Sequence, residues 1–71
     1  MRLEFEYDES HWLMTVEEKT LTVFLPIGGQ WVPVKDSLIE EDIFDDWDYY
    51  YKALNLINQW SMESDKNDTS K

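Results

Sequence analysis

Cysteine is absent from this chain of 71 residues, which removes two common ways of stabilising a small protein. Without thiols there is neither a disulfide framework nor a thiolate metal site. A chain of this length buries only ~60% of the surface that it exposes when unfolded, so its stability depends on packing or association. Cysteine-free chains suit a reducing compartment, and the first ten residues, MRLEFEYDES, lack the apolar core of a secretion signal. We therefore expect a cytoplasmic location.

Groups that enzymes use in catalysis are nearly missing. His11 is the single histidine, so a serine nucleophile would have almost no base to activate it. Asp42, Asp45 and Asp46 could share a hard cation, but the D-x-D-x-D-G loop pattern is absent, and a regular helix offers one ion too few oxygens. We therefore predict a non-enzymatic protein with no catalytic residues, no metal site and no cofactor.

Basic residues are also few, because six Lys and Arg stand against sixteen Asp and Glu, for a formal net charge of −10. Residues 36–51 hold seven acids and no base. Nucleic acids and anionic membranes are bound through clustered Lys and Arg, so we expect no direct binding to either. No segment approaches the ~20 apolar residues of a membrane span. A basic surface on another protein would be attracted instead.

Hydrophobic residues are nevertheless plentiful, at 42% of the chain, and 15% of the residues are aromatic, which is typical of a folded domain. Over residues 1–35, apolar and polar side chains alternate with the period of two of a half-buried strand. We predict an antiparallel β-meander of three to four strands, at about 2–7, 11–17, 20–25 and 31–34. Pro26 and Gly28-Gly29 predict a turn after the third strand, and Pro33 restricts the fourth to a sheet edge.

Beyond residue 36 the apolar spacing changes to three and four, which is the period of a helix. We predict one long C-terminal helix, about 38–60, packed on one face of the sheet, so that the fold class is α+β. Ser37 and Glu40 match a capping box at its start. A break within this segment is the alternative, because Asp45 or Asp46 would cap a second helix.

The length of the chain allows one domain at most, and no internal repeat is present. We predict a single small α+β domain over residues 1–61. Polar residues dominate the segment SMESDKNDTSK, which begins at Ser61. We therefore expect residues 62–71 to form a disordered polar tail.

The predicted helix carries two apolar stripes. The first would face the sheet and comprises Ile43, Tyr50, Leu54 and Ile57, and we expect Phe44 and Trp47 beside it to be core residues as well. The second would face outward, toward a partner or a second copy of the chain, and comprises Tyr49, Ala53, Leu56 and Trp60. The alternative is that Trp60 folds back on its own sheet.

Within the predicted helix, Glu41, Asp42, Asp45 and Asp46 have only like charges three or four residues away. Such pairs mildly destabilise a helix, which favours a binding role, although a solvated outer face is the simpler interpretation. The seven acids from Asp36 to Asp48 would span ~18 Å of helix, or one charge per ~3 Å, near the ~3.4 Å between phosphates of a DNA strand. The predicted partner-binding residues are Glu41, Asp42, Asp45, Asp46, Asp48, Tyr49, Leu56 and Trp60.

Together these features predict a small protein-binding module. The function that they favour is an inhibitor or decoy, of phage or mobile-element type, that imitates nucleic acid and occupies the basic nucleic-acid-binding surface of a partner protein. An immunity protein or antitoxin that covers a basic toxin site is one alternative. A homodimeric structural or regulatory subunit, joined through Tyr49, Leu56 and Trp60, is another.

Overall fold

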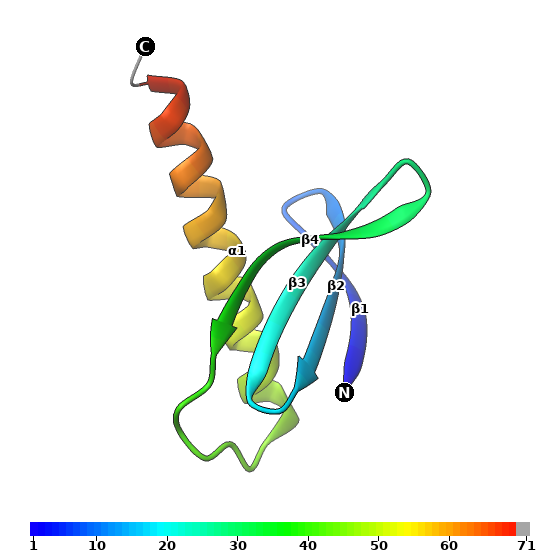
Figure 1. The fold of residues 1–71 in the computed structure, drawn as a ribbon, viewed down its shortest axis with the longest axis vertical. Helices are drawn as coiled ribbons and strands as arrows, with labels where there is room; N and C mark the ends of the chain where they lie inside the picture. The colour runs from blue at the N-terminus through cyan, green and yellow to red at the C-terminus, as the bar shows by residue number, and fades with distance from the viewer. Residues whose placement is uncertain (70–71) are drawn as a thin grey trace.

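Four strands and one helix follow one another along the chain in a computed structural model, which describes the backbone of residues 1–69 and the side chains of residues 1–63. The strands form one antiparallel sheet in the order of the sequence, and the helix crosses one face of it (Figure 1). The predicted α+β meander is therefore confirmed. The elements are β1 (Arg2–Tyr7), β2 (Ser10–Glu17), β3 (Thr20–Ile27), β4 (Gln30–Leu38) and α1 (Asp46–Thr69).

Each of the three hairpins turns on two residues with positive φ. A left-handed two-residue turn fits the twist of antiparallel strands, and glycine is the residue that adopts it without strain. The third turn uses two glycines, whereas the first two force side chains into this region of φ. The turn residues are Asp8 (54°), Glu9 (63°), Glu18 (48°), Lys19 (68°), Gly28 (62°) and Gly29 (79°).

The third turn lies later than Pro26 predicts, because Pro26 still belongs to β3 and pairs with Trp31. Its ring removes one donor from the ladder without ending the strand, and the chain turns only at the two glycines. As predicted, Pro33 lies in an edge strand, since β4 pairs only with β3.

A bulge shapes β4 next to this proline. Val23 pairs with Lys35 and Phe24 pairs with Pro33, which leaves Val34 as an extra residue in β4. Val34 packs against the core, and the Lys35 ammonium lies 3.0 Å from the Glu63 carboxylate on α1. The bulge therefore turns two consecutive side chains of β4 toward the helix.

The predicted start of the helix near residue 38 is wrong. Ser37 and Leu38 belong to β4 and pair with Leu21 and Thr20, so the ladder satisfies backbone groups that a helix would have used. The Ser37 hydroxyl lies 3.5 Å from the Leu38 carbonyl, so the predicted capping box does not form. The strand ends where the Ile39 amide donates to the Lys19 carbonyl at 2.7 Å.

An irregular segment, residues 39–45, connects β4 to the helix, which begins at Asp46. The Asp45 carboxylate accepts a hydrogen bond from the Trp47 amide at 3.0 Å, and the Asp45 carbonyl accepts one from the Asp48 amide at 3.0 Å. Asp45 therefore caps the helix, as the alternative prediction of a second, capped helix start requires. Asp46 and Asp48 in the first turn suit the positive end of the helix dipole.

The core lies between α1 and the face of the sheet that α1 covers (Figure 1). Ala53, Leu56 and Ile57 are the helix residues that are buried there. Tyr49 and Trp60 are half-buried and pack against the same cluster. The sheet and the connecting segment contribute Trp12, Met14, Leu21, Val23 and Ile39.

The predicted outward direction of the second stripe is therefore wrong, and the alternative for Trp60 is correct. The Trp60 ring lies edge-on to Trp12, with ring centroids 5.8 Å apart. The difference follows from the helix start. The predicted sheet-facing stripe includes Ile43, which lies in the connecting segment, so a residue outside the helix enters the predicted phase.

One hydrogen bond forms within the first hairpin, and a second joins that hairpin to α1. The Trp12 indole Nε1 donates to the Tyr7 carbonyl at 3.1 Å, and the Tyr7 hydroxyl donates to Asn58 Oδ1 at 2.9 Å. Both aromatic residues thereby keep their polar atoms paired beside an apolar core.

The backbone of α1 continues past residue 61 to Thr69. Side chains beyond Glu63 and the backbone of residues 70 and 71 lie outside the described residues, so the disordered tail, residues 62–71, stays a prediction. In the described part of the chain, no helix combines the length and the apolar character needed to cross a membrane.

Candidate protein-interaction surface

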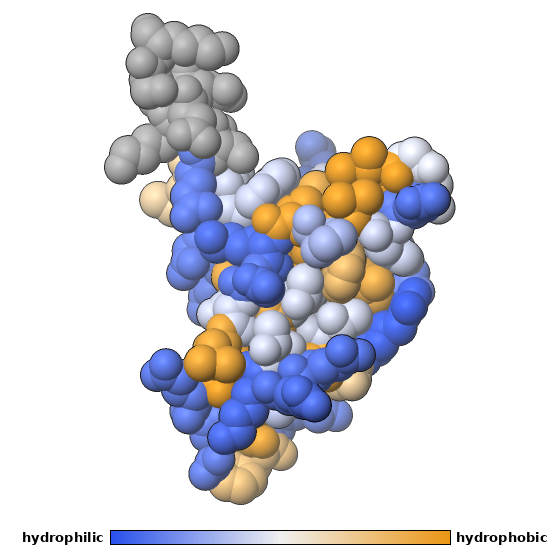
Figure 2. Space-filling model, viewed as in Figure 1, coloured by the Kyte–Doolittle hydropathy of each residue, from blue (hydrophilic) through white to orange (hydrophobic). Residues whose placement is uncertain are grey.

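One end of the molecule is strongly acidic. The connecting segment and the first turn of α1 lie there beside the β2–β3 turn, which the hydrogen bond from Ile39 to Lys19 holds in place (Figure 1). Figure 2 shows hydrophilic atoms gathered over this end in the lower part of the view. It carries half of the sixteen carboxylates of the chain and two lysines, Lys19 and Lys52. We call it the acidic end and define it by Glu17, Glu18, Glu40, Glu41, Asp42, Asp45, Asp46 and Asp48.

Some of these acids have a structural role. The Lys52 ammonium lies 2.6 Å from Glu41 Oε1. This hydrogen bond, together with the positive charge of Lys52, lowers the pKa of Glu41 below its ordinary value of 4.5. Asp45 is the helix cap. The expectation that no base pairs with the predicted acids is therefore wrong for Glu41, because helical spacing was assumed for a residue that lies before the helix.

The acids do not follow one helix. Asp36 lies in β4, and Glu41 and Asp42 lie in the connecting segment. The predicted spacing of one charge per ~3 Å of helix axis does not apply to these positions, since it used the helical rise. The structure instead gathers the five predicted acids at one end of the molecule.

Exposed apolar side chains lie among these acids. Phe44 is 95% exposed and Trp47 is 63% exposed, although both were predicted to be core residues. Phe44 borders a shallow hollow of about 230 Å³, together with Ile43 and Tyr49. Large exposed aromatic side chains are uncommon on a free surface and are enriched among the residues that dominate protein–protein affinity.

Beside the acidic end, a second hollow borders the free edge of β1. This β1 cleft has a volume of about 540 Å³, and its walls are mostly apolar. The Tyr50 ring lines it and lies edge-on to Phe5 and to Trp47, at centroid distances of 5.3 and 5.7 Å. The residues that line the cleft are Met1, Arg2, Leu3, Asp46, Trp47 and Tyr50.

The face of the sheet away from α1 carries the one histidine. His11 stacks on Trp31 at a centroid distance of 5.6 Å, and its Nε2 lies 3.3 Å from Glu4 Oε1. Leu13, on the same face, is buried, and Phe24 beside it is half-buried. In Figure 2, hydrophobic atoms also gather over the β3–β4 hairpin, in the upper part of the view.

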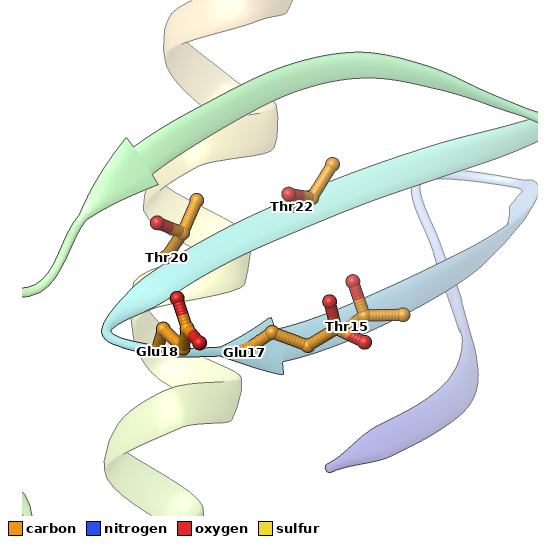
Figure 3. A pocket seen from close by; sticks show the side chains of 5 residues that line it. All are labelled: Thr15, Glu17, Glu18, Thr20 and Thr22. Atoms are coloured by element: carbon orange, nitrogen blue, oxygen red, sulfur yellow. The ribbon is translucent and has the colours of Figure 1, made fainter.

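A polar hollow of about 590 Å³ lies on this face near the acidic end. Figure 3 shows its side chains, the hydroxyls of Thr15, Thr20 and Thr22 and the carboxylates of Glu17 and Glu18. The two glutamates add to the negative charge of the acidic end. Among the described residues, no group of three or more His, Cys, Asp or Glu side chains is placed to hold a metal ion.

The structure separates the eight predicted partner-binding residues into two groups. Glu41, Asp42, Asp45, Asp46 and Asp48 are exposed at the acidic end, whereas Tyr49, Leu56 and Trp60 pack on the sheet. Phe44 and Trp47 are the surface residues that sequence reasoning missed. The signal that would have found them is the pair Asp45-Asp46, because a helix capped there leaves Phe44 before the cap. Comparison of the chain with protein-family models, with curated proteins and with solved structures found no match.

Proposed function

We propose that this protein is a non-enzymatic binding module whose acidic end docks on a basic surface of a partner protein. The observation that supports this most directly is the exposure of Phe44 and Trp47 among carboxylates. Complementary charge speeds association and selects the partner, whereas affinity comes mainly from a few anchoring side chains that become fully buried. The acidic end contains both kinds of group side by side.

The basic surface of a nucleic-acid-binding protein is the partner surface that this proposal favours, and the module would act there as an inhibitor or decoy. Its carboxylates would take the place of phosphates, and Phe44 and Trp47 would occupy space next to the basic groups as bases do. This imitation of nucleic acid is supported by the concentration of charged and aromatic groups at one end of the molecule. It does not depend on a regular spacing of charges along a helix. A basic toxin site covered by an immunity protein would demand the same groups.

A homodimer joined through Tyr49, Leu56 and Trp60 is not part of the proposal. Leu56 is 5% exposed, and the other two side chains pack against the same core cluster. A partner could reach Leu56 only if α1 left the sheet.

The test compares retention of a basic partner by the wild-type chain and by three variants. The first combines Asp42→Asn with Asp46→Asn and removes two charges from the acidic end. The control combines Asp8→Asn with Glu9→Gln and removes two charges from the β1–β2 turn, at the other end of the sheet (Figure 1). Phe44→Ala, in a separate variant, removes the exposed anchor.

We expect the control to keep the partner, the double change at Asp42 and Asp46 to weaken binding about tenfold, and Phe44→Ala to weaken it by a similar factor. Binding of the wild type should also fall steeply between about 0.05 M and about 0.3 M salt. A basic partner that stays bound to both acidic-end variants as tightly as to the control would rule the proposal out.

A further inference from the structure

The two edges of the sheet differ in how they are protected. β4 carries Pro33, the bulge at Val34 and Lys35, which are devices that discourage another strand from pairing with an edge. β1 contains no proline and no glycine, and it pairs with β2 in one unbroken register from Arg2 to Tyr7. The edge at β1 is therefore regular enough to accept a further strand.

The register shows which backbone groups of β1 are free. Met1 and Val16 exchange two hydrogen bonds, of 2.9 and 3.2 Å. Hydrogen-bonded pairs alternate with non-bonded pairs in an antiparallel ladder, so Arg2, Glu4 and Glu6 direct their N–H and C=O groups away from β2. Among the described residues, no other segment forms backbone hydrogen bonds with these three.

The side chains along this edge separate into two chemical rows. Leu3 and Phe5 lie on the side of the helix, where the β1 cleft exposes Trp47 and Tyr50 next to the strand. Glu4 and Glu6 lie on the opposite face of the sheet, because successive residues of a strand alternate. An incoming strand would therefore meet apolar groups on one of its faces and, on the other, the two carboxylates, with Arg2 at the start of the same row.

We propose that β1 binds an extended segment of the basic partner as a fifth strand, in which Lys or Arg alternates with apolar residues. The basic side chains pair across the strand with Glu4 and Glu6, and the apolar side chains enter the β1 cleft against Trp47. The partner's basic character rests on the proposed function. The free backbone groups and the two rows of side chains are independent of the proposed function. They require an extended segment in the partner, which attraction between charges alone would not require.

A second copy of the chain is less suited to this edge. Antiparallel pairing of two β1 strands centred on Glu4 places the two Glu4 carboxylates directly opposite each other, which destabilises a sheet, although it also places Arg2 of each copy opposite Glu6 of the other. Each copy would also bring a net charge of −10. A basic strand removes both sources of repulsion.

The experiment uses the full chain and a synthetic peptide of about eight residues in which lysine alternates with valine, long enough to cover β1. We expect the peptide to slow hydrogen exchange of the Glu4 and Glu6 amides about tenfold at saturation, because these amides become part of a ladder. A peptide with glutamate in place of lysine should give no protection.

Two variants separate the backbone from the charge. Glu6→Pro removes an outward N–H that β2 does not use, and should weaken peptide binding about tenfold, whereas Glu6→Gln removes only the charge and should weaken it about threefold. If Glu6→Pro does not fold, N-methylation of alternate peptide amides removes the reciprocal hydrogen bonds, from the peptide N–H groups to the outward carbonyls of β1, with the wild-type chain. Loss of protection at β1 is the expected result in both cases.

The outcomes distinguish this inference from the proposed function. A peptide that binds without protecting the β1 amides, or that binds Glu6→Pro as it binds Glu6→Gln, would overturn the fifth strand. A dimer that forms without peptide, and that Glu6→Pro disrupts, would assign the edge to a second copy instead. If Phe44→Ala releases the partner while the β1 amides stay unprotected from hydrogen exchange, the result supports the proposed function and not the fifth strand. If the peptide protects the β1 amides in the wild type and in every acidic-end variant, while these variants bind the basic partner as the control does, the result supports the fifth strand and not the proposed function.

Discussion

The Asp45 carboxylate lies 3.0 Å from the Trp47 amide, and this contact caps the first turn of α1. A helix that started at residue 38 would take Phe44 and Trp47 into its length and bury at least one of them. Because the chain turns helical only after Asp45, Phe44 stays in the connecting segment and Trp47 lies at the rim of the β1 cleft. One side-chain cap thus sets the position of both exposed aromatic residues.

Removing this cap should destabilise the protein. We expect Asp45→Ala to lower the free energy of unfolding by about 1 kcal/mol, or about 4–8 °C in Tm, because the Trp47 amide loses its acceptor. Asp45→Asn keeps an oxygen at the same place and should cost much less. Thermal unfolding followed by circular dichroism measures the difference, and Asp42→Ala serves as the control. Equal Tm values for Asp45→Ala and Asp42→Ala would show that the cap contributes nothing.

A substitution in the first hairpin turn should stabilise the protein. Glu9 has a φ of 63°, which an L side chain adopts at a cost and glycine adopts freely. We expect Glu9→Gly to raise the free energy of unfolding by about 0.5–1 kcal/mol in urea denaturation. Glu9→Ala removes the same charge without relieving φ and should give no such gain. A gain that is equal in the two variants would trace the effect to charge.

The helix stripe that faces the sheet should respond as a core. Leu56→Ala should lower the free energy of unfolding by about 3 kcal/mol, since it leaves a cavity between α1 and β3. Tyr51→Ala, on the exposed side of α1, should change it by less than about 0.5 kcal/mol. Chemical denaturation with two-state fitting measures both. A free energy of unfolding that is as little changed in Leu56→Ala as in Tyr51→Ala would contradict the packing described for α1.

The contact between Lys52 and Glu41 should be visible in a titration. Lys52 lowers the pKa of Glu41, so the folded protein binds this proton less tightly than the unfolded chain does. The contribution to stability is therefore present above the unfolded pKa of the carboxyl and disappears as the pH falls through the lower folded pKa. Nuclear magnetic resonance of the Glu41 carboxyl should give a midpoint below 4.5 that returns to its ordinary value in Lys52→Gln. An unchanged midpoint in this variant would remove Lys52 as the cause.

The sheet could be predicted from sequence because its signals are local. Alternation along Leu3, Phe5 and Tyr7, and the Gly28-Gly29 turn, determine strand and hairpin without reference to the rest of the chain. The helix start could not be fixed in the same way, since Ser37 with Glu40 and Asp45 with Trp47 both offer a cap. Pairing of Ser37 with Leu21 decided between them, and that contact joins residues far apart in the sequence.

The same dependence on contacts between distant residues explains which parts of the candidate site could be predicted from the sequence. The acids at Asp42, Asp45 and Asp46 could be identified from composition alone, but the direction of the helix stripes depended on the helix start. Both stripes are apolar, so hydrophobic spacing did not distinguish the one that contains Tyr50 from the one that contains Leu56. Leu3 and Trp47 line the same β1 cleft, and no local sequence pattern predicts that they lie near each other.

The order of the strands has a consequence for how the chain folds. Each strand pairs with its neighbour in the sequence through a two-residue turn, so the sheet closes only short loops as it assembles. Hairpins of this kind form within about 1–10 μs, and topologies rich in local pairing fold quickly. Docking of α1 joins segments that are far apart in the sequence, because Leu56 and Ile57 of the helix then pack on the sheet. We expect the barrier to folding to lie there, with substitutions in this stripe slowing folding more than substitutions in the first hairpin turn.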